Sequence, residues 1–204
     1  MRPGQAPLRA IAPRFRDPFP VAFYDRPTAT VARALVGACL LVRGPGGLAA
    51  ARVVETEAYV ANDPANHAAR GETLRNRSMF AGPGTLYVYQ IHQVHCANAV
   101  TRRGEAVLLR AAEPISDGLP SLSGPGRLCR GLGIGKADDG SSFVLGRIRL
   151  GPGTPPAPKV VTAPRVGISQ ARERPLRFLW DRHAAVSAPR PWRRGVAYFS
   201  FAQS

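Results

Sequence analysis

Short apolar runs separated by glycine- and proline-rich turns are the feature that most constrains the fold of this chain. Stretches of this kind, rich in valine, leucine, isoleucine and tyrosine, are typical of β-strands. They occupy residues 38–43, 48–59, 85–90, 95–101, 105–111, 143–150, 158–163 and 175–180. The sequence therefore predicts a sheet-dominated fold, in which GPGG at 44–47 turns the first two strands into a hairpin.

Few segments show a helical pattern. The run ATVARAL at 29–35 predicts one short helix, with Asp25 or Thr28 as its N-terminal cap and Gly37 at its C-terminal end. Segments 114–128 and 151–158 are rich in Pro, Gly and Ser, and we expect them to be surface loops. A chain of 204 residues is long enough for one domain with its own core.

Net charge is the unusual part of the composition. The 28 basic and 13 acidic residues give a formal charge of +15, which indicates a polyanionic partner and favours nucleic acid. Residues 1–18 carry four arginines and four prolines without helical or alternating periodicity. We expect them to form a disordered basic arm, followed by a single folded domain over residues 19–204. No apolar run is long enough to span a membrane, so no membrane partner is expected.

Metal and phosphate-loop chemistry have weak support in the sequence. No glycine-rich phosphate loop followed by Lys-Ser or Lys-Thr is present. His92 and His95 lie three residues apart beside Cys96, but their surroundings are strand-like, and a third and a fourth ligand are missing, so no metal is predicted. The three cysteines are scattered, and we expect reduced, buried thiols.

Two acidic side chains and a phenol alternate along one predicted strand. If RVVETEAY at 52–59 is extended, then Glu55, Glu57 and Tyr59 share one face, since side chains repeat every two residues. An ionised carboxylate in a partly dry site can accept a proton from water. The alternative is a solvent-facing edge whose acids pair with arginines.

Aromatic and basic residues gather downstream of this strand. Basic groups contact phosphates and aromatic faces stack on bases, so the combination favours a nucleic-acid site over a plain sheet core. The residues concerned are His67, Arg70, Arg75, Arg77, Phe80, Tyr87 and Tyr89. The tyrosines taken alone are more typical of a sheet core than of a surface that stacks on bases.

Eight ordered blocks resemble one known family. They are VVETEAY, NHAARG, TLRNRSMF, GPGTLYVY, HCANAV, AVLLRAAEP, SGPGRLCRGLGI and PRVGIS. In this order they closely resemble the alkyladenine (3-methyladenine) DNA glycosylase family, from about residue 20 to about residue 187. The resemblance implies an α+β fold: a single compact domain around a curved antiparallel β-sheet, with a protruding hairpin that enters the minor groove of DNA.

The resemblance also assigns roles to individual residues. Glu57 corresponds to the family's general base, and Arg110 corresponds to the arginine that helps to hold the attacking water. The side chains that would surround a flipped base are Tyr59, His67 and Tyr89, and Asn98 would be the wall that excludes the exocyclic amine of guanine.

One position departs from the family pattern. His92 stands where the family carries the tyrosine that fills the gap left by the flipped nucleotide, and the run to Cys96 is one residue shorter. An imidazole fills less of that gap. His92 is therefore expected to contact DNA at the gap, and Arg70, Thr73, Arg75 and Arg165 are expected to contact the DNA backbone.

Lysine is scarce in this chain. Only Lys136 and Lys159 could supply a side-chain amine for a Schiff base, so the expected enzyme is monofunctional and leaves an intact abasic site. Together with this lysine count, the family resemblance implies a monomeric, cofactor-free, cytoplasmic and nucleoid-associated glycosylase. It would remove alkylated purines, chiefly 3-methyladenine, from double-stranded DNA to begin base excision repair.

Two alternatives stay open at this point. The same fold resembles the C-terminal domain of methionyl-tRNA formyltransferase, so the chain could be a non-catalytic nucleic-acid-binding module. It could also be a damage sensor that lost efficient base flipping together with its tyrosine. The glutamate of ETEAY favours an enzyme, because a binding module has no use for it.

Overall fold

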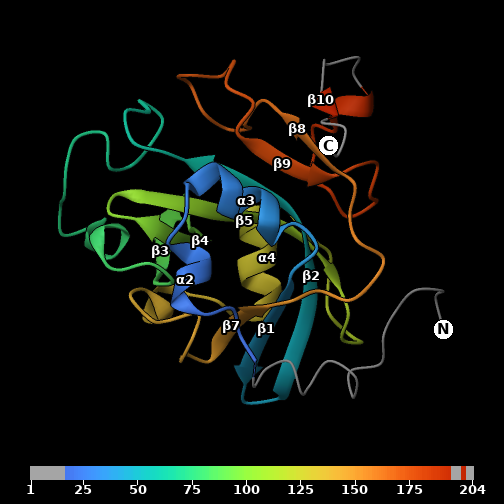
Figure 1. Cartoon of the computed structure of the whole chain (residues 1–204). Helices are drawn as coiled ribbons and strands as arrows, with labels where there is room; N and C mark the ends of the chain where they lie inside the picture. The colour runs from blue at the N-terminus through green and yellow to red at the C-terminus, as the bar shows by residue number, and fades with distance from the viewer. Residues whose placement is uncertain (1–16, 194–198, 201–204) are drawn as a thin grey trace.

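The computed structural model describes residues 17–193 and 199–200. The predicted basic arm lies outside this range except for Asp17 and Pro18. Within the described part, one strongly curled antiparallel sheet forms the body of a single domain (Figure 1). The predicted α+β class is confirmed.

Ten strands make up the sheet in the part of the chain that the structure describes. Their order is β10-β8-β9-β2-β5-β4-β3, with β1 paired to β2 and β7, and β6 paired to β5. The bounds are β1 Cys39–Gly44, β2 Gly47–Tyr59, β3 Leu86–Ile91, β4 Val94–Arg102, β5 Glu105–Pro114, β6 Leu122–Ser123, β7 Ile148–Gly151, β8 Val160–Ala163, β9 Arg177–Trp180 and β10 Phe199–Ser200. The predicted β1–β2 hairpin is confirmed, with its turn closed by the Gly44–Gly47 pair.

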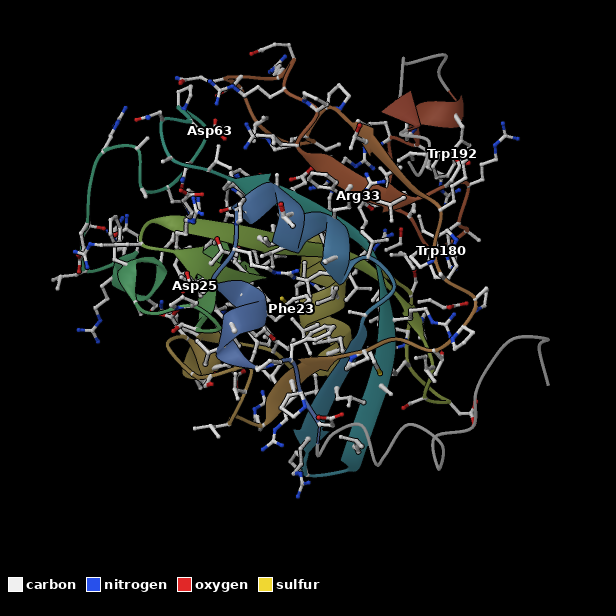
Figure 2. All side chains as sticks on the ribbon, viewed as in Figure 1. Phe23, Asp25, Arg33, Asp63, Trp180 and Trp192 are labelled. Carbon is white, nitrogen blue, oxygen red and sulfur yellow. The ribbon has the colours of Figure 1, made fainter. Side chains whose placement is uncertain are left out.

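The helices lie inside the curve of the sheet (Figure 1). They are α2 (Val21–Tyr24), α3 (Thr28–Leu35) and α4 (Pro125–Leu132), with the 3-10 turns η2 (Arg77–Phe80), η3 (Lys136–Asp138) and η4 (Pro191–Arg193). Apolar side chains of the three helices and of one sheet face form the main core. Phe23 of α2, labelled in Figure 2, is a partly buried side chain that packs against this core.

The start of α3 differs from the prediction. Neither Asp25 nor Thr28 caps the helix; its N-cap is Pro27, which makes no side-chain hydrogen bond to the helix. The hydroxyl of Thr28 instead lies 2.8 Å from that of Thr101 and donates to the carboxylate of Glu105. Long-range polar partners therefore replaced the local cap.

Two segments were also assigned wrongly. Residues 114–128, expected to be a loop, contain β6 and the first half of α4, and of the expected strand 143–150 only the end belongs to β7. The two glycines of α4 disfavour a helix by local propensity. The helix forms because Leu128, Cys129 and Leu132 are buried in the main core, while Gly133 ends it at a left-handed φ of +62°.

The pairing of β2 with β5 is irregular where the predicted catalytic residues lie. The register steps from Val53–Ala112 to Glu55–Ala111 and then to Thr56–Leu109. Val54 and Arg110 are thus the extra residues of two opposed bulges, which cancel each other. Bulges re-aim side chains, and here the bulge in β5 carries Arg110.

Among the described residues, no helix is long and apolar enough to cross a membrane.

Candidate active site

Two buried carboxylates of β2 form the centre of the site. Glu55 and Glu57 have no exposed surface, whereas Thr56 between them points to the opposite face, where its hydroxyl donates to the Ala32 carbonyl of α3. The predicted alternation is confirmed. The alternative of a solvent-facing edge is wrong, because both acids are inside the protein.

Arg110 joins the two acids. Its Nε lies 2.9 Å from Oε1 of Glu55, and its Nη1 lies 3.5 Å from Oε1 of Glu57. The Arg110 Nη1 also donates to the Val166 carbonyl at 3.4 Å. A guanidinium held by several acceptors in a nearly dry site has a fixed orientation.

Glu55 is held by groups that the sequence did not reveal. Its Oε1 accepts from Nε of Arg177 at 2.7 Å and from the Ser187 hydroxyl at 3.0 Å, and its Oε2 accepts from the Ser187 backbone N–H at 2.7 Å. Arg177 is itself only 2% exposed. The one sequence signal for this arrangement is an arginine inside the apolar strand-like run 175–180.

Glu57 has a different environment. Its Oε1 accepts the backbone N–H of Val166 at 2.8 Å, and its Oε2 accepts the hydroxyl of Tyr59 at 3.0 Å. Burial raises the pKa of Glu57 above that of an ordinary glutamate, and this desolvation outweighs the opposing effects of Arg110 and the Val166 N–H. Such a carboxylate holds a proton more readily than an exposed one, as a base that accepts a proton from water requires.

Tyr59 is supported from behind by a buried ion pair. Arg165 forms two hydrogen bonds with the carboxylate of Asp63, and its guanidinium lies 4.7 Å from the centre of the Tyr59 ring. Asp63 lies in the loop that follows β2 (Figure 2). Arg165 is only 4% exposed, so it is not placed to contact DNA as the sequence had suggested. A guanidinium closed inside the protein fixes the tyrosine instead.

An aromatic cavity of about 580 Å³ opens beside these residues. The predicted Tyr59, His67, Tyr89, Asn98 and Arg110 all line it, whereas Glu57 lies behind Tyr59, Val166 and Arg110. The structure thus brings the predicted catalytic and base-binding residues together. Further lining residues that the sequence had not assigned include Met79, Cys96, Leu108, Val166 and the segment 167–170.

The aromatic walls of the cavity are held together by edge contacts. The His67 and Tyr89 rings lie 4.4 Å apart at 78°, and Nδ1 of His67 lies 3.1 Å from the Tyr87 hydroxyl. Desolvation lowers the pKa of His67, which favours the neutral form of its imidazole. A neutral ring is compatible with a positively charged ligand beside it.

Asn98 forms a rigid part of the wall. Its Nδ2 donates to the backbone carbonyls of Tyr87 at 3.1 Å and Cys96 at 3.2 Å. Both partners are acceptors, so they define which end of the amide is nitrogen. The side chain is 3% exposed and cannot swing aside without breaking both hydrogen bonds.

The remaining predicted DNA contacts lie at the surface. His92 and Gln93 form the two-residue turn between β3 and β4, with φ of +45° and +63°. Positive φ at both turn residues is the geometry that tight hairpins favour. Arg70, Thr73 and Arg75 are exposed on the loop before η2, and Arg70 also lines the cavity. Among the described residues, no group of three His, Cys, Asp or Glu side chains could hold a metal ion.

These features define a class of protein. A buried carboxylate behind an aromatic cavity, with an arginine-bearing loop at its edge, is typical of enzymes that act on a base taken out of a nucleic-acid helix. The family model described as Methylpurine-DNA glycosylase (MPG) matches residues 22–184. The chain belongs to this family and is a DNA glycosylase that acts on alkylated bases.

Curated relatives agree with this membership. A protein of Rhodopirellula baltica is 42% identical over 189 residues, which cover 81% of each chain. A protein of Methanoculleus marisnigri is 44% identical over 78% of this chain and 93% of its own length, and one of Anaeromyxobacter dehalogenans is 46% identical over 84% and 86%. All three carry the name "Putative 3-methyladenine DNA glycosylase".

Proposed function

We propose that this protein is a monofunctional DNA glycosylase that excises alkylated purines, chiefly 3-methyladenine, by base flipping and attack of water at C1′. The observation that carries the proposal is the position of Glu57. Its carboxylate is fully buried, has a raised pKa and is hydrogen-bonded to two groups that line the base-sized cavity.

The aromatic cavity would hold the flipped base. Rotating a nucleotide out of the duplex costs a few kcal/mol, and stacking is worth about 1–3 kcal/mol per base. A purine alkylated at N3 or N7 is a cation and is attracted to the faces of Tyr59 and Tyr89. The lowered pKa of His67 reduces the positive charge that its imidazole would present to such a base. The cavity thus favours cationic alkylated purines.

The chemical step follows from the position of Glu57. The carboxylate takes a proton from a water molecule, and the water oxygen forms a bond to C1′ of the deoxyribose. The bond between C1′ and the base breaks, and its electron pair neutralises the positive charge of the alkylated base, which leaves without an added proton. Arg110 orients the site, since it binds Glu57 and the Val166 carbonyl at the same time.

Asn98 would act in discrimination. Two carbonyls hold its amide in place, so the exocyclic amine of guanine could be accommodated only if hydrogen bonds of Asn98 were broken.

Contacts with the DNA itself would come from other residues. His92 at the hairpin turn would enter the gap in the duplex, and Arg70, Thr73 and Arg75 would contact phosphates. Arg165 would act indirectly, by fixing Tyr59. The protein is proposed to work as a monomer without a cofactor.

The test of the reaction is single-turnover release of 3-methyladenine from methylated duplex DNA. We expect free base to appear and strand breaks to appear only after hot alkali, because a monofunctional enzyme leaves the abasic sugar intact. Breaks without alkali would contradict the monofunctional mechanism. Tight binding to the duplex without release of base would favour the damage sensor, and His92 would then be the first residue to change.

The pH dependence of excision provides a separate prediction. A general base works only when it is deprotonated, so the rate should rise with pH through the pKa of Glu57. Burial raises that pKa, so the acidic limb should lie above the value of about 4.3 for an unperturbed glutamate. Single-turnover rates measured from pH 4 to pH 8 check this. An acidic limb at or below the unperturbed value would contradict the assignment.

A further inference from the structure

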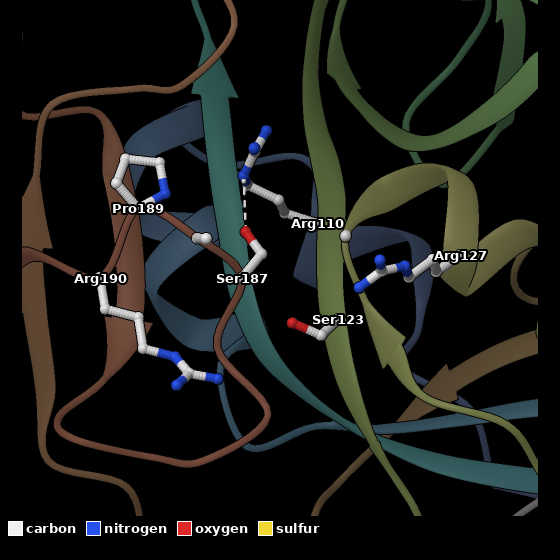
Figure 3. A pocket seen from close by; sticks show the side chains of 8 residues that line it. Arg110, Ser123, Arg127, Ser187, Pro189 and Arg190 are labelled. Carbon is white, nitrogen blue, oxygen red and sulfur yellow. Dashed lines mark hydrogen bonds between the residues drawn. The ribbon is translucent and has the colours of Figure 1, made fainter.

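A second cavity lies next to the base cavity and has a different character. Its volume is about 680 Å³, and we name it the arginine pocket. The residues that line it are Arg110, Ser123, Gly124, Arg127, Ser187, Ala188, Pro189 and Arg190. Figure 3 shows Arg127 of α4 and Arg190 of the loop before η4 on opposite sides of it, with Ser123 and Ser187 between them.

Part of the positive charge of the arginine pocket has no counter-charge among the described residues. Glu55 and Glu57 balance Arg110. Arg190 donates only to the backbone carbonyls of Val186 and Ala184, at 2.9 and 2.7 Å. Neither Arg127 nor Arg190 has a carboxylate partner among the residues that the structure describes. Two guanidiniums that face one cavity without a carboxylate partner among the described residues favour an anion between them.

The start of α4 adds to this preference. Its N-cap is Gly124, which lines the pocket and offers no side chain to the first backbone N–H groups of the helix. Unpaired N–H groups at a helix N-terminus attract anions, and phosphate is the commonest of them. The helix thus supports the two arginines in binding the same ligand.

We propose that the arginine pocket binds one backbone phosphate of the damaged strand, within two nucleotides of the flipped base. This inference rests on the proposed function. Two connections between the cavities support it: Arg110 lines both of them, and Gly124 of the arginine pocket adjoins Pro125 of the base cavity. Because the cavities adjoin, a strand whose base occupies the base cavity would bring a neighbouring phosphate to the arginine pocket. Arg127 and Arg190 then position the strand so that C1′ faces Glu57.

The experiment uses duplexes with a tetrahydrofuran abasic analogue, which cannot be excised. In each duplex a single phosphate near the analogue is replaced by an uncharged methylphosphonate. We expect one position within two nucleotides to weaken binding by the wild-type protein about tenfold, the effect of losing one charge-assisted contact. The same replacement should have little effect on Arg127→Gln or Arg190→Gln, because their contact is already lost.

Arg130→Gln is the matched control, since Arg130 is an exposed arginine of the same helix that does not line the pocket. It removes the same charge and should keep the methylphosphonate effect. The salt dependence of binding should also fall by about 0.9 in log–log slope for Arg127→Gln. Equal responses of Arg127→Gln and Arg130→Gln at every position would overturn the proposal.

Inorganic phosphate distinguishes a strand phosphate from a free one. If phosphate binds the wild type and not Arg127→Gln, while the methylphosphonate scan shows no sensitive position, the pocket binds a free anion and the proposal is wrong. None of these measurements uses base release. A failure of the glycosylase proposal would therefore appear as absent excision, independently of the binding result.

Discussion

Replacing Glu57 by glutamine should lower the single-turnover rate of 3-methyladenine release by about a thousandfold, within the range that general-base catalysis contributes. The amide has the shape of the carboxylate, and its oxygen can still accept the N–H of Val166. It cannot take a proton from water. The variant should fold, because ionised Glu57 is a cost to the folded state: its pKa is raised on folding, so its contribution to stability falls as pH rises through that pKa.

Glu113→Gln is the control for this experiment. Glu113 lies near the far end of β5, is one-third exposed and pairs with Arg52 at 4.0 Å. Its replacement should leave excision unchanged, and both variants should bind an abasic-analogue duplex as the wild type does. If Glu57→Gln released 3-methyladenine at a near-normal rate, Glu57 would not be the general base. Loss of binding together with release would indicate a structural role for Glu57.

Replacing Glu55 by glutamine should lower the free energy of unfolding by about 3–5 kcal/mol, as expected when one partner of a buried ion pair is removed. The change leaves the guanidinium of Arg177 without a counter-charge at a position where it is 2% exposed. It also removes the nearer of the two carboxylates that hold Arg110. Urea unfolding with Glu57→Gln as the comparison measures the difference.

A double variant separates the loss of an ion pair from a general loss of packing. Arg177→Met together with Glu55→Gln removes both charges, so the unpaired cation is no longer present. We expect Glu55→Gln/Arg177→Met to be more stable than Glu55→Gln alone. The loss of stability in the double variant could instead equal the sum of the losses in the two single variants. The charges of Glu55 and Arg177 would then not be coupled, and the assignment of Glu55 as the centre of this network would be wrong.

Glu55 is a positioning residue in this scheme. It touches neither base nor water, but its Oε1 fixes Nε of Arg110, and Nη1 of Arg110 reaches Glu57. The excision rate of Glu55→Gln should therefore fall under conditions where the variant is still folded. The acidic limb of the pH profile of Glu55→Gln should also move. Arg110 lowers the pKa of Glu57, and Glu55 holds Arg110 in the place from which it does so.

The sequence alone predicted the features of the fold and of the site that depend on local sequence pattern. Alternation along RVVETEAY placed Glu55 and Glu57 on one face, and turn residues at 44–47 defined the first hairpin. The ordered motifs indicated Tyr59, His67, Tyr89, Asn98 and Arg110, all of which line one cavity. Side-chain periodicity and turn chemistry involve neighbours in the chain, so the sequence expresses them directly.

Only the tertiary structure decided the remainder. The partner of Glu55 is Arg177, 122 residues away, and the partner of Arg165 is Asp63, 102 residues away. Helix α4 forms despite two glycines because the core buries its apolar side, and the bulge at Arg110 exists only in the pairing of β2 with β5. These features have one physical reason in common. A buried charge, or a segment with low helix propensity, is stabilised by residues that are distant in the sequence, and only the folded chain brings those residues next to it.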